Sequence, residues 1–144
     1  MSIFFINEGT FEVGDGWDDR SVTALTFPSG MQTPEASFTV TRDPLVHGAG
    51  SSVSDYVDEQ LSRLARSCPQ FDLIRRDVAT IADQPGQLVE FTWKTPEGRL
   101  VRQIQGVLIC NAIALVLTGT APRDRFADFS DTFRSMIGSF RLRE

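Results

Sequence analysis

The first third of the chain alternates between apolar and polar residues, which is the period of a β-strand with one buried face. A short segment at 10–13 is followed by a glycine-containing turn at 14–16, and longer alternating segments occupy 21–27 and 36–42. One face of each longer segment carries bulky side chains, and the other carries small or hydroxylated ones. The pattern predicts three strands in this part of the chain.

A helical period replaces this alternation after a loop at 43–51 that contains glycine and proline. Between Ser52 and Cys68, apolar residues recur every three or four positions, as they do on one face of a helix. Ser52 or Ser54 can cap the first turn, because a serine hydroxyl accepts a hydrogen bond from a free backbone amide there. Pro69 cannot continue the helix, so the pattern predicts its end just before this residue.

The second half of the chain predicts a meander of strands and then a second helix. Strands are predicted at 71–81, 87–93, 99–110 and 112–120, with turns at 83–86, at 95–98 and about Asn111. Pro122 is expected to open the helix, since the first helical position tolerates proline, and Gly138 is expected to end it before a last short strand at 139–142. The apolar stripe of this helix consists of Phe126, Phe129, Phe133, Met136 and Ile137.

These elements predict one α+β domain that spans residues 1–144. A chain of this length suits a single core. Strands interrupted by only two helices favour an antiparallel sheet over a doubly wound parallel one. The two main helices are expected to pack on the faces or ends of that sheet.

Charge and hydropathy narrow the range of partners. The formal net charge is −5, which disfavours nucleic acid as a ligand. The first residues lack the basic region and the long apolar stretch of a signal peptide. The most apolar segment, 107–117, is too short to span a bilayer, which takes about 20 apolar residues. We therefore expect a cytoplasmic protein without stable membrane insertion.

Candidate catalytic groups are sparse. His47 is the only histidine and lies in the loop at 43–51, where a lone imidazole is more often solvated than catalytic. The sequence has no cluster of metal-ligating His or Cys and no phosphate-binding loop, so we expect no metal, no cofactor and no catalytic residue. Cys68 and Cys110 are expected to be reduced thiols, and the sequence leaves open whether they lie close together.

Three glutamines stand where a sheet and a helix could form a groove. Gln103 and Gln105 share one face of the strand predicted at 99–110, and Gln60 shares a helix face with Leu64 and Cys68. Glutamine offers hydrogen-bond donors and acceptors to a bound partner. The alternative is that these glutamines are ordinary exposed side chains.

Several short motifs occur in a characteristic order over nearly the whole chain. They are Ile6-Asn-Glu8, Phe11-Glu-Val13, Trp17-Asp-Asp-Arg-Ser-Val22, Glu35-Ala-Ser-Phe-Thr-Val-Thr-Arg-Asp43, Asp55-Tyr-Val57, Gln60-Leu61, Pro69-Gln-Phe71, the region of Trp93, and Arg102-Gln103. In this order they resemble the Eag-type, or effector-associated, chaperones of bacterial type VI secretion. That family is related to the DcrB lipoproteins and shares the fold of PsbP-like proteins.

The resemblance implies a PsbP-like fold and a homodimer whose sheets form a concave, partly apolar groove. It implies as client the N-terminal transmembrane region of a toxin effector that carries a PAAR spike-tip domain. Positions matched to the family place the groove at Val22, Ser37, Thr41, Gln60, Leu64, Cys68 and Gln103, and the strand faces add Ala24, Thr39, Val101 and Gln105. The register at Leu100 and Val101 is left open. The alternative function is that of a non-catalytic accessory or binding protein of the cell envelope with the same fold.

Overall fold

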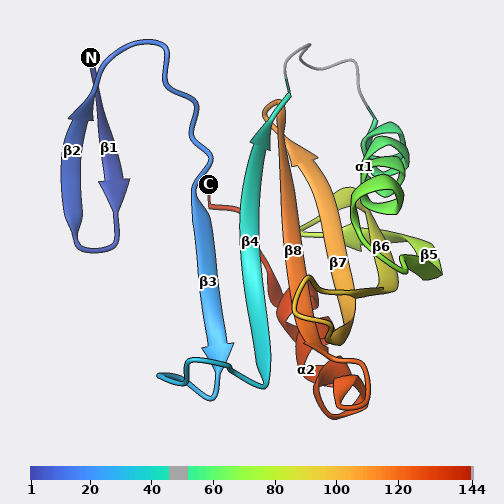
Figure 1. Cartoon of the computed structure of the whole chain (residues 1–144). Helices are drawn as coiled ribbons and strands as arrows, with labels where there is room; N and C mark the ends of the chain where they lie inside the picture. The colour runs from blue at the N-terminus through green and yellow to red at the C-terminus, as the bar shows by residue number, and fades with distance from the viewer. Residues whose placement is uncertain (46–51, 144) are drawn as a thin grey trace.

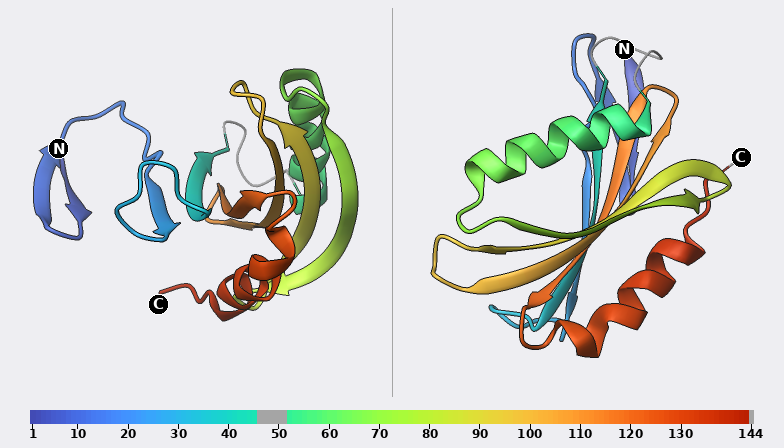
Figure 2. Two further views of the ribbon diagram at one scale, coloured as in Figure 1. Left: turned by 60° about the horizontal axis from the view of Figure 1, so that its bottom comes forward. Right: turned by 90° about the vertical axis from the view of Figure 1, so that its right-hand side faces the viewer.

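The computed structural model describes residues 1–45 and 52–143. Six strands form one antiparallel sheet in the order β3-β4-β8-β7-β6-β5, and helices α1 and α2 pack on opposite faces of it (Figures 1 and 2). A hairpin of β1 and β2 stands apart from this sheet. The bounds are β1 Ser2–Ile6, β2 Gly9–Val13, β3 Val22–Phe27, β4 Ala36–Pro44, α1 Val53–Ser67, β5 Asp72–Ile81, β6 Gln84–Lys94, β7 Leu100–Cys110, β8 Ile113–Pro122 and α2 Phe126–Ser139. The predicted α+β class, an antiparallel sheet with two helices, is confirmed.

Pairing between distant parts of the chain completes the sheet. β4 pairs with β3 on one side and with β8 on the other, and the register sets Ser37 opposite Thr120 and Thr39 opposite Thr118. The strands from β5 to β8 are neighbours in chain order, as the predicted meander requires. Asn111 connects β7 to β8 with a φ of 52°, the left-handed backbone that a tight hairpin turn needs.

Helix α1 begins at the cap that its sequence indicates. The hydroxyl of Ser52 accepts a hydrogen bond from the Asp55 amide at 3.1 Å, so Ser52 and not Ser54 caps the helix. The helix packs over β6 and β7, and Val57 is buried there against Phe91. The helical spacing of its apolar residues therefore places one face of α1 on the sheet.

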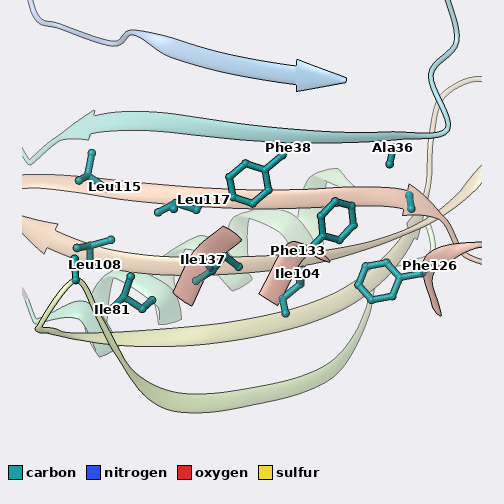
Figure 3. Packing of buried hydrophobic residues seen from close by; sticks show 12 residues of the cluster. Ala36, Phe38, Ile81, Ile104, Leu108, Leu115, Leu117, Phe126, Phe133 and Ile137 are labelled. Carbon is teal, nitrogen blue, oxygen red and sulfur yellow. The ribbon is translucent and has the colours of Figure 1, made fainter. Parts of the chain in front are cut away.

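The opposite face of the sheet carries the larger core, which Figure 3 shows. Phe126, Phe133 and Ile137 of α2 are buried in it. Phe133 lies directly over Gly119, where a Cβ atom would stand only 2.3 Å from the ring, so glycine is needed for the helix to approach this closely. The predicted apolar stripe is confirmed, because all five of its residues lie in or against this core.

The start of α2 differs from the prediction. Pro122 ends β8 opposite Val101, and the helix begins only at Phe126. The carbonyl of Pro122 accepts a hydrogen bond from the Arg125 amide at 2.9 Å, which turns the chain between the two elements. Proline suits the last position of a strand as well as the first of a helix, so its presence alone did not distinguish them.

Four other features also differ from the prediction. The turn between β5 and β6 consists of Ala82 and Asp83, both with positive φ, and Gly86 therefore lies within β6. α2 continues through Gly138 to Ser139, because Gly138 does not take the left-handed backbone with which a glycine ends many helices. Residues 140–142 do not form a strand, and β1 was not predicted. The apolar run of β1 lacks the polar alternation that marks a half-buried strand.

Candidate binding groove

Helix α1 covers only part of its face of the sheet. It lies over β6 and β7, and within residues 1–45 and 52–143 no helix covers the side formed by β3, β4 and β8 (Figure 1). Because residues paired across antiparallel strands share a face, the register identifies the side chains of this uncovered surface. We call it the open face: Val22, Ala24, Thr26, Ser37, Thr39, Thr41, Gln103, Thr118 and Thr120. Thr118 is buried, at 7% exposed, and the other eight are at least partly exposed.

Two rows of side chains run across the strands of the open face, and Val22 and Thr41, which pair with each other, lie beyond them. One row passes from Ala24 through Thr39 and Thr118 to Gln105, and the second passes from Thr26 through Ser37 and Thr120 to Gln103. Each row starts with a small side chain at the edge strand β3 and ends with a glutamine on β7. None of these side chains is charged.

A series of hydrogen bonds gives the second row a fixed donor-to-acceptor direction. The indole nitrogen of Trp93 donates to Gln103 Oε1 at 2.8 Å, and Gln103 Nε2 donates to Thr120 Oγ1 at 2.7 Å. An indole can only donate, so it fixes which end of the Gln103 amide faces β8. Thr120 accepts in this series, and its own hydroxyl hydrogen is left to donate to a partner.

The first row is joined to α1. Gln60 Nε2 donates to Gln105 Oε1 at 2.8 Å, and Gln105 is only 8% exposed. Two amides can exchange donor and acceptor roles by rotating, because neither is tied to a group that only donates. This pair therefore marks the boundary between the helix and the open face. Either glutamine can act as the donor in its hydrogen bond.

One end of the open face lies beside an ionic contact. The Tyr56 hydroxyl on α1 donates to Asp43 Oδ2 at 2.8 Å, and Arg20 Nη1 lies 3.1 Å from the other Asp43 oxygen. Burial of Tyr56 and its hydrogen bond to Asp43 both raise the pKa of the phenol above its usual value of about 10. Charged groups stand at this end and not within the rows.

The other end opens into a cavity of about 380 Å³. Ser37, Thr120 and Val101 line it together with the loop at 32–35. Val101 pairs with Trp93 and is therefore on the same face as the rows, which resolves the register that the sequence left open at Leu100.

The eleven predicted groove residues fall into four groups. Five belong to the two rows: Ala24, Ser37, Thr39, Gln103 and Gln105. Val22 and Thr41 pair with each other on the same face, next to the rows. Val101 lines the end cavity, and Gln60 borders the open face from α1. Leu64 packs partly against the core under α1, and Cys68 is the partly buried C-cap of that helix.

Three residues of the open face were not predicted: Thr26, Thr118 and Thr120. Thr26 shares the alternation of Val22 and Ala24, so its strand pattern contained the signal. The two β8 threonines had none, because only the pairing of β4 with β8 brings them beside Ser37 and Thr39.

Groups for other chemistry are scarce in the part of the chain that the structure describes. It contains no group of three His, Cys, Asp or Glu residues that could hold a metal ion. Neither described helix has the length and apolarity to cross a membrane. Cys68 and Cys110 are free thiols, as expected, and His47 lies outside the described residues.

Comparison with known proteins agrees with this architecture. The sequence model of the DcrB family matches residues 8–139. The chain is 29% identical over 106 residues to the protein named Effector EagT6 of Pseudomonas aeruginosa, and this alignment covers 72% of each chain. Among solved structures, a P. aeruginosa protein of unknown function, called a putative regulator, aligns with a TM-score of 0.83 at 24% identity, over 100% of this chain and 98% of that one. Cyanobacterial PsbP from Synechocystis aligns with a TM-score of 0.58 at 10% identity, over 85% and 82% of the two chains. The expected PsbP-like fold is confirmed.

Proposed function

Because the chain belongs to the DcrB family and is related to the Eag proteins, we propose that it is an effector chaperone of type VI secretion. Its client is the N-terminal transmembrane region of a toxin effector with a PAAR domain, which it shields until the effector is loaded onto the secretion spike. The chaperone acts in the cytoplasm as a homodimer, with residues 1–144 as a single domain. It has no catalytic step and needs no cofactor.

The observation that carries this proposal is the uncharged, small-residue surface beside α1. Helices pack in membranes through small residues, which let backbones approach, and through hydrogen bonds from Ser, Thr and Gln side chains. Ala24, Ser37 and Thr39 supply small side chains, and Gln103 supplies hydrogen-bonding groups. The open face thus offers an apolar helix the kind of contacts that another membrane helix would offer.

The absence of charge within the rows supports the same client. An apolar helix in water would aggregate or insert into a nearby membrane unless its surface were covered. A charged side chain on the covering surface would lose its water and remain unpaired, which is costly. The rows place hydroxyl and amide groups there instead, and the charged Asp43 and Arg20 stand at one end.

A charge introduced into the open face tests the proposal. Ala24→Asp and Thr39→Asp should release the client, because an aspartate against the middle of an apolar helix costs about 2.5–3.5 kcal/mol, roughly a hundredfold in Kd. Ala24 is exposed on an edge strand, so the fold should tolerate the change. Leu64 is a poorer position, because it packs against the core and a charge there would test the fold as well.

The assay is co-purification of the chaperone with the N-terminal transmembrane fragment of a PAAR-domain effector from the same organism. Thr80→Asp is the matched control, since Thr80 is an exposed strand residue on β5, at the far edge of the sheet. We expect Thr80→Asp to retain the fragment, and circular dichroism to show that every variant is folded. Full retention by a folded Ala24→Asp and a folded Thr39→Asp would refute the open face as the binding surface.

A further inference from the structure

Another cavity lies on the α2 side of the sheet, opposite the open face. Its volume is about 420 Å³, and it forms where the segment 140–143, which follows α2, passes β3 and β4 (Figures 1 and 2). Val40 and Leu115 line it and also belong to or pack against the core under α2. This cavity and the proposed client groove are therefore on different faces of the molecule.

Basic side chains dominate the polar lining of this cavity. Arg42 of β4 lines it together with Arg141 and Arg143, and none of the lining residues that the structure describes is acidic. The whole chain has 14 basic and 19 acidic side chains, so three guanidinium groups around one cavity run against its overall charge. Like charges held close together repel one another, and a bound anion would remove that repulsion.

One neighbouring carboxylate offsets part of this charge. Asp19 Oδ2 lies 3.0 Å from Arg42 Nε, yet this buried nitrogen has no hydrogen-bond partner among residues 1–45 and 52–143. So short a distance without a hydrogen bond means that the N–H of Arg42 is not directed at this oxygen. Asp19 is itself held by Ser21, whose amide donates to Oδ1 at 2.9 Å. Three guanidinium groups and one carboxylate leave two positive charges at the cavity.

The end of α2 fixes the position of Arg141. Its Nη1 donates to the carbonyl of Gly138 at 2.9 Å and to the carbonyl of Phe140 at 2.8 Å. These bonds use two of the five N–H donors of a guanidinium group and leave three for a ligand. Phe140 and Leu142 pack against the core, and the alternate residues Arg141 and Arg143 are exposed. Packing of this segment therefore holds both arginines beside the cavity while leaving them accessible.

Charge and lining together favour a phosphate monoester as the ligand. Such a group carries about −1.5 to −2 charges at pH 7, which matches the two remaining positive charges. Guanidinium groups bind phosphate through paired N–H donors, and Thr23 adds a hydroxyl to the lining. Apolar side chains form the rest of the lining, so the organic group of an ester would find apolar contacts there. A monocarboxylate would neutralise only one of the two charges.

We propose that this cavity binds a phosphate monoester, with Arg42, Arg141 and Arg143 around the phosphate group and the apolar lining against the organic group. The site does not depend on the proposed function, because it lies away from the open face. This chemistry has two sources, which are a soluble phosphate ester and the headgroup of a lipid such as phosphatidic acid. The experiment distinguishes them.

Phenyl phosphate is the first probe, because it joins a phosphate monoester to an apolar ring. Equilibrium dialysis of the full chain should show saturable binding. Inorganic phosphate should bind more weakly, since it makes no contact with the apolar lining. Sodium chloride keeps the ionic strength equal in both measurements, so that screening is the same. The absence of saturable binding of phenyl phosphate, or equal affinities for the two anions, would overturn the proposal.

Two arginine variants locate the site. Arg141→Gln and Arg143→Gln each remove hydrogen bonds from a charged group, so each should raise the Kd for phenyl phosphate at least about tenfold. Arg66→Gln is the matched control, because Arg66 is exposed in the last turn of α1, on the other face of the sheet. Arg42 is left in place, because its removal would also break the contact with Asp19. Circular dichroism checks folding. Wild-type affinity in either folded cavity variant, or an equal loss in Arg66→Gln, would overturn the proposal.

Vesicles distinguish the two sources of the ligand. Co-sedimentation is measured with phosphatidylcholine vesicles that contain or lack phosphatidic acid. Binding only to the vesicles with phosphatidic acid, lost in Arg143→Gln and kept in Arg66→Gln, would support the site with a lipid headgroup as its ligand. Binding of phenyl phosphate without binding to either kind of vesicle would support the site with a soluble ester as its ligand.

Discussion

A methyl group added at Gly119 tests how α2 is held on the sheet. A Cβ atom there would stand 2.3 Å from Cγ of Phe133 and 2.6 Å from both of its Cδ atoms, far closer than ordinary contact. The ring has little room to move, because it is 3% exposed and its centroid lies 5.8 Å from that of Phe126 and 6.4 Å from that of Phe38. Gly119→Ala must therefore displace either the ring or the helix.

The size of the effect follows from the two opposite changes at this contact. Gly119→Ala overpacks a filled core, which costs about 1–3 kcal/mol of unfolding free energy. Phe133→Ala empties the same place and should cost about 3–5 kcal/mol through lost transfer energy and the cavity left behind. In the double variant the new methyl group enters the space that the ring has left. The loss of unfolding free energy in the double variant should therefore be about 0.5–3 kcal/mol smaller than the sum of the losses in the two single variants.

The assay is denaturant unfolding followed by circular dichroism for the wild type, both single variants and the double variant. Gly138→Ala is the control, because a Cβ at Gly138 in α2 meets no atom within 4 Å. It should be neutral or stabilise the helix by up to about 1 kcal/mol. Gly119→Ala unfolding at the wild-type midpoint, or losses that simply add in the double variant, would refute the account of this contact.

Two further predictions concern polar groups on either side of the sheet. Tyr56 is the only tyrosine. Its burial, and to a smaller extent its hydrogen bond to Asp43, raise the pKa of its phenol. The stabilisation from this raised pKa is present below the unfolded value of about 10 and is lost as the pH rises above it. In an absorbance titration, tyrosinate should form at a higher pH in the folded protein than in denaturant. Equal titration midpoints in the two states would contradict this. Glu90 is 3% exposed and binds both Arg102 and Arg134, so Glu90→Ala should cost about 3 kcal/mol, at the lower end for a broken buried pair because both arginines reach solvent. Arg134→Ala removes one charged hydrogen bond and should cost about 1.5 kcal/mol; equal unfolding free energies for these two variants would show that the arginines do not share Glu90.

Much of the fold follows from local patterns that the sequence contains by itself. The spacing of Val57, Gln60 and Leu64 sets one face of α1 on the sheet. The sequence also narrowed the cap of this helix to two serines, of which the structure selects Ser52. Alternation likewise determined which side chains of β3 and β4 share a face, because successive residues of a strand point to opposite sides. These properties depend on neighbours only a few positions apart, so a single sequence suffices to predict them.

Only the tertiary structure decided which strands lie side by side. Thr118 and Thr120 complete the open face because β8 pairs with β4, about 80 residues earlier in the chain. The free energy that selects this pairing comes from packing over the whole core, including the ring of Phe133 on Gly119, and no local period encodes it.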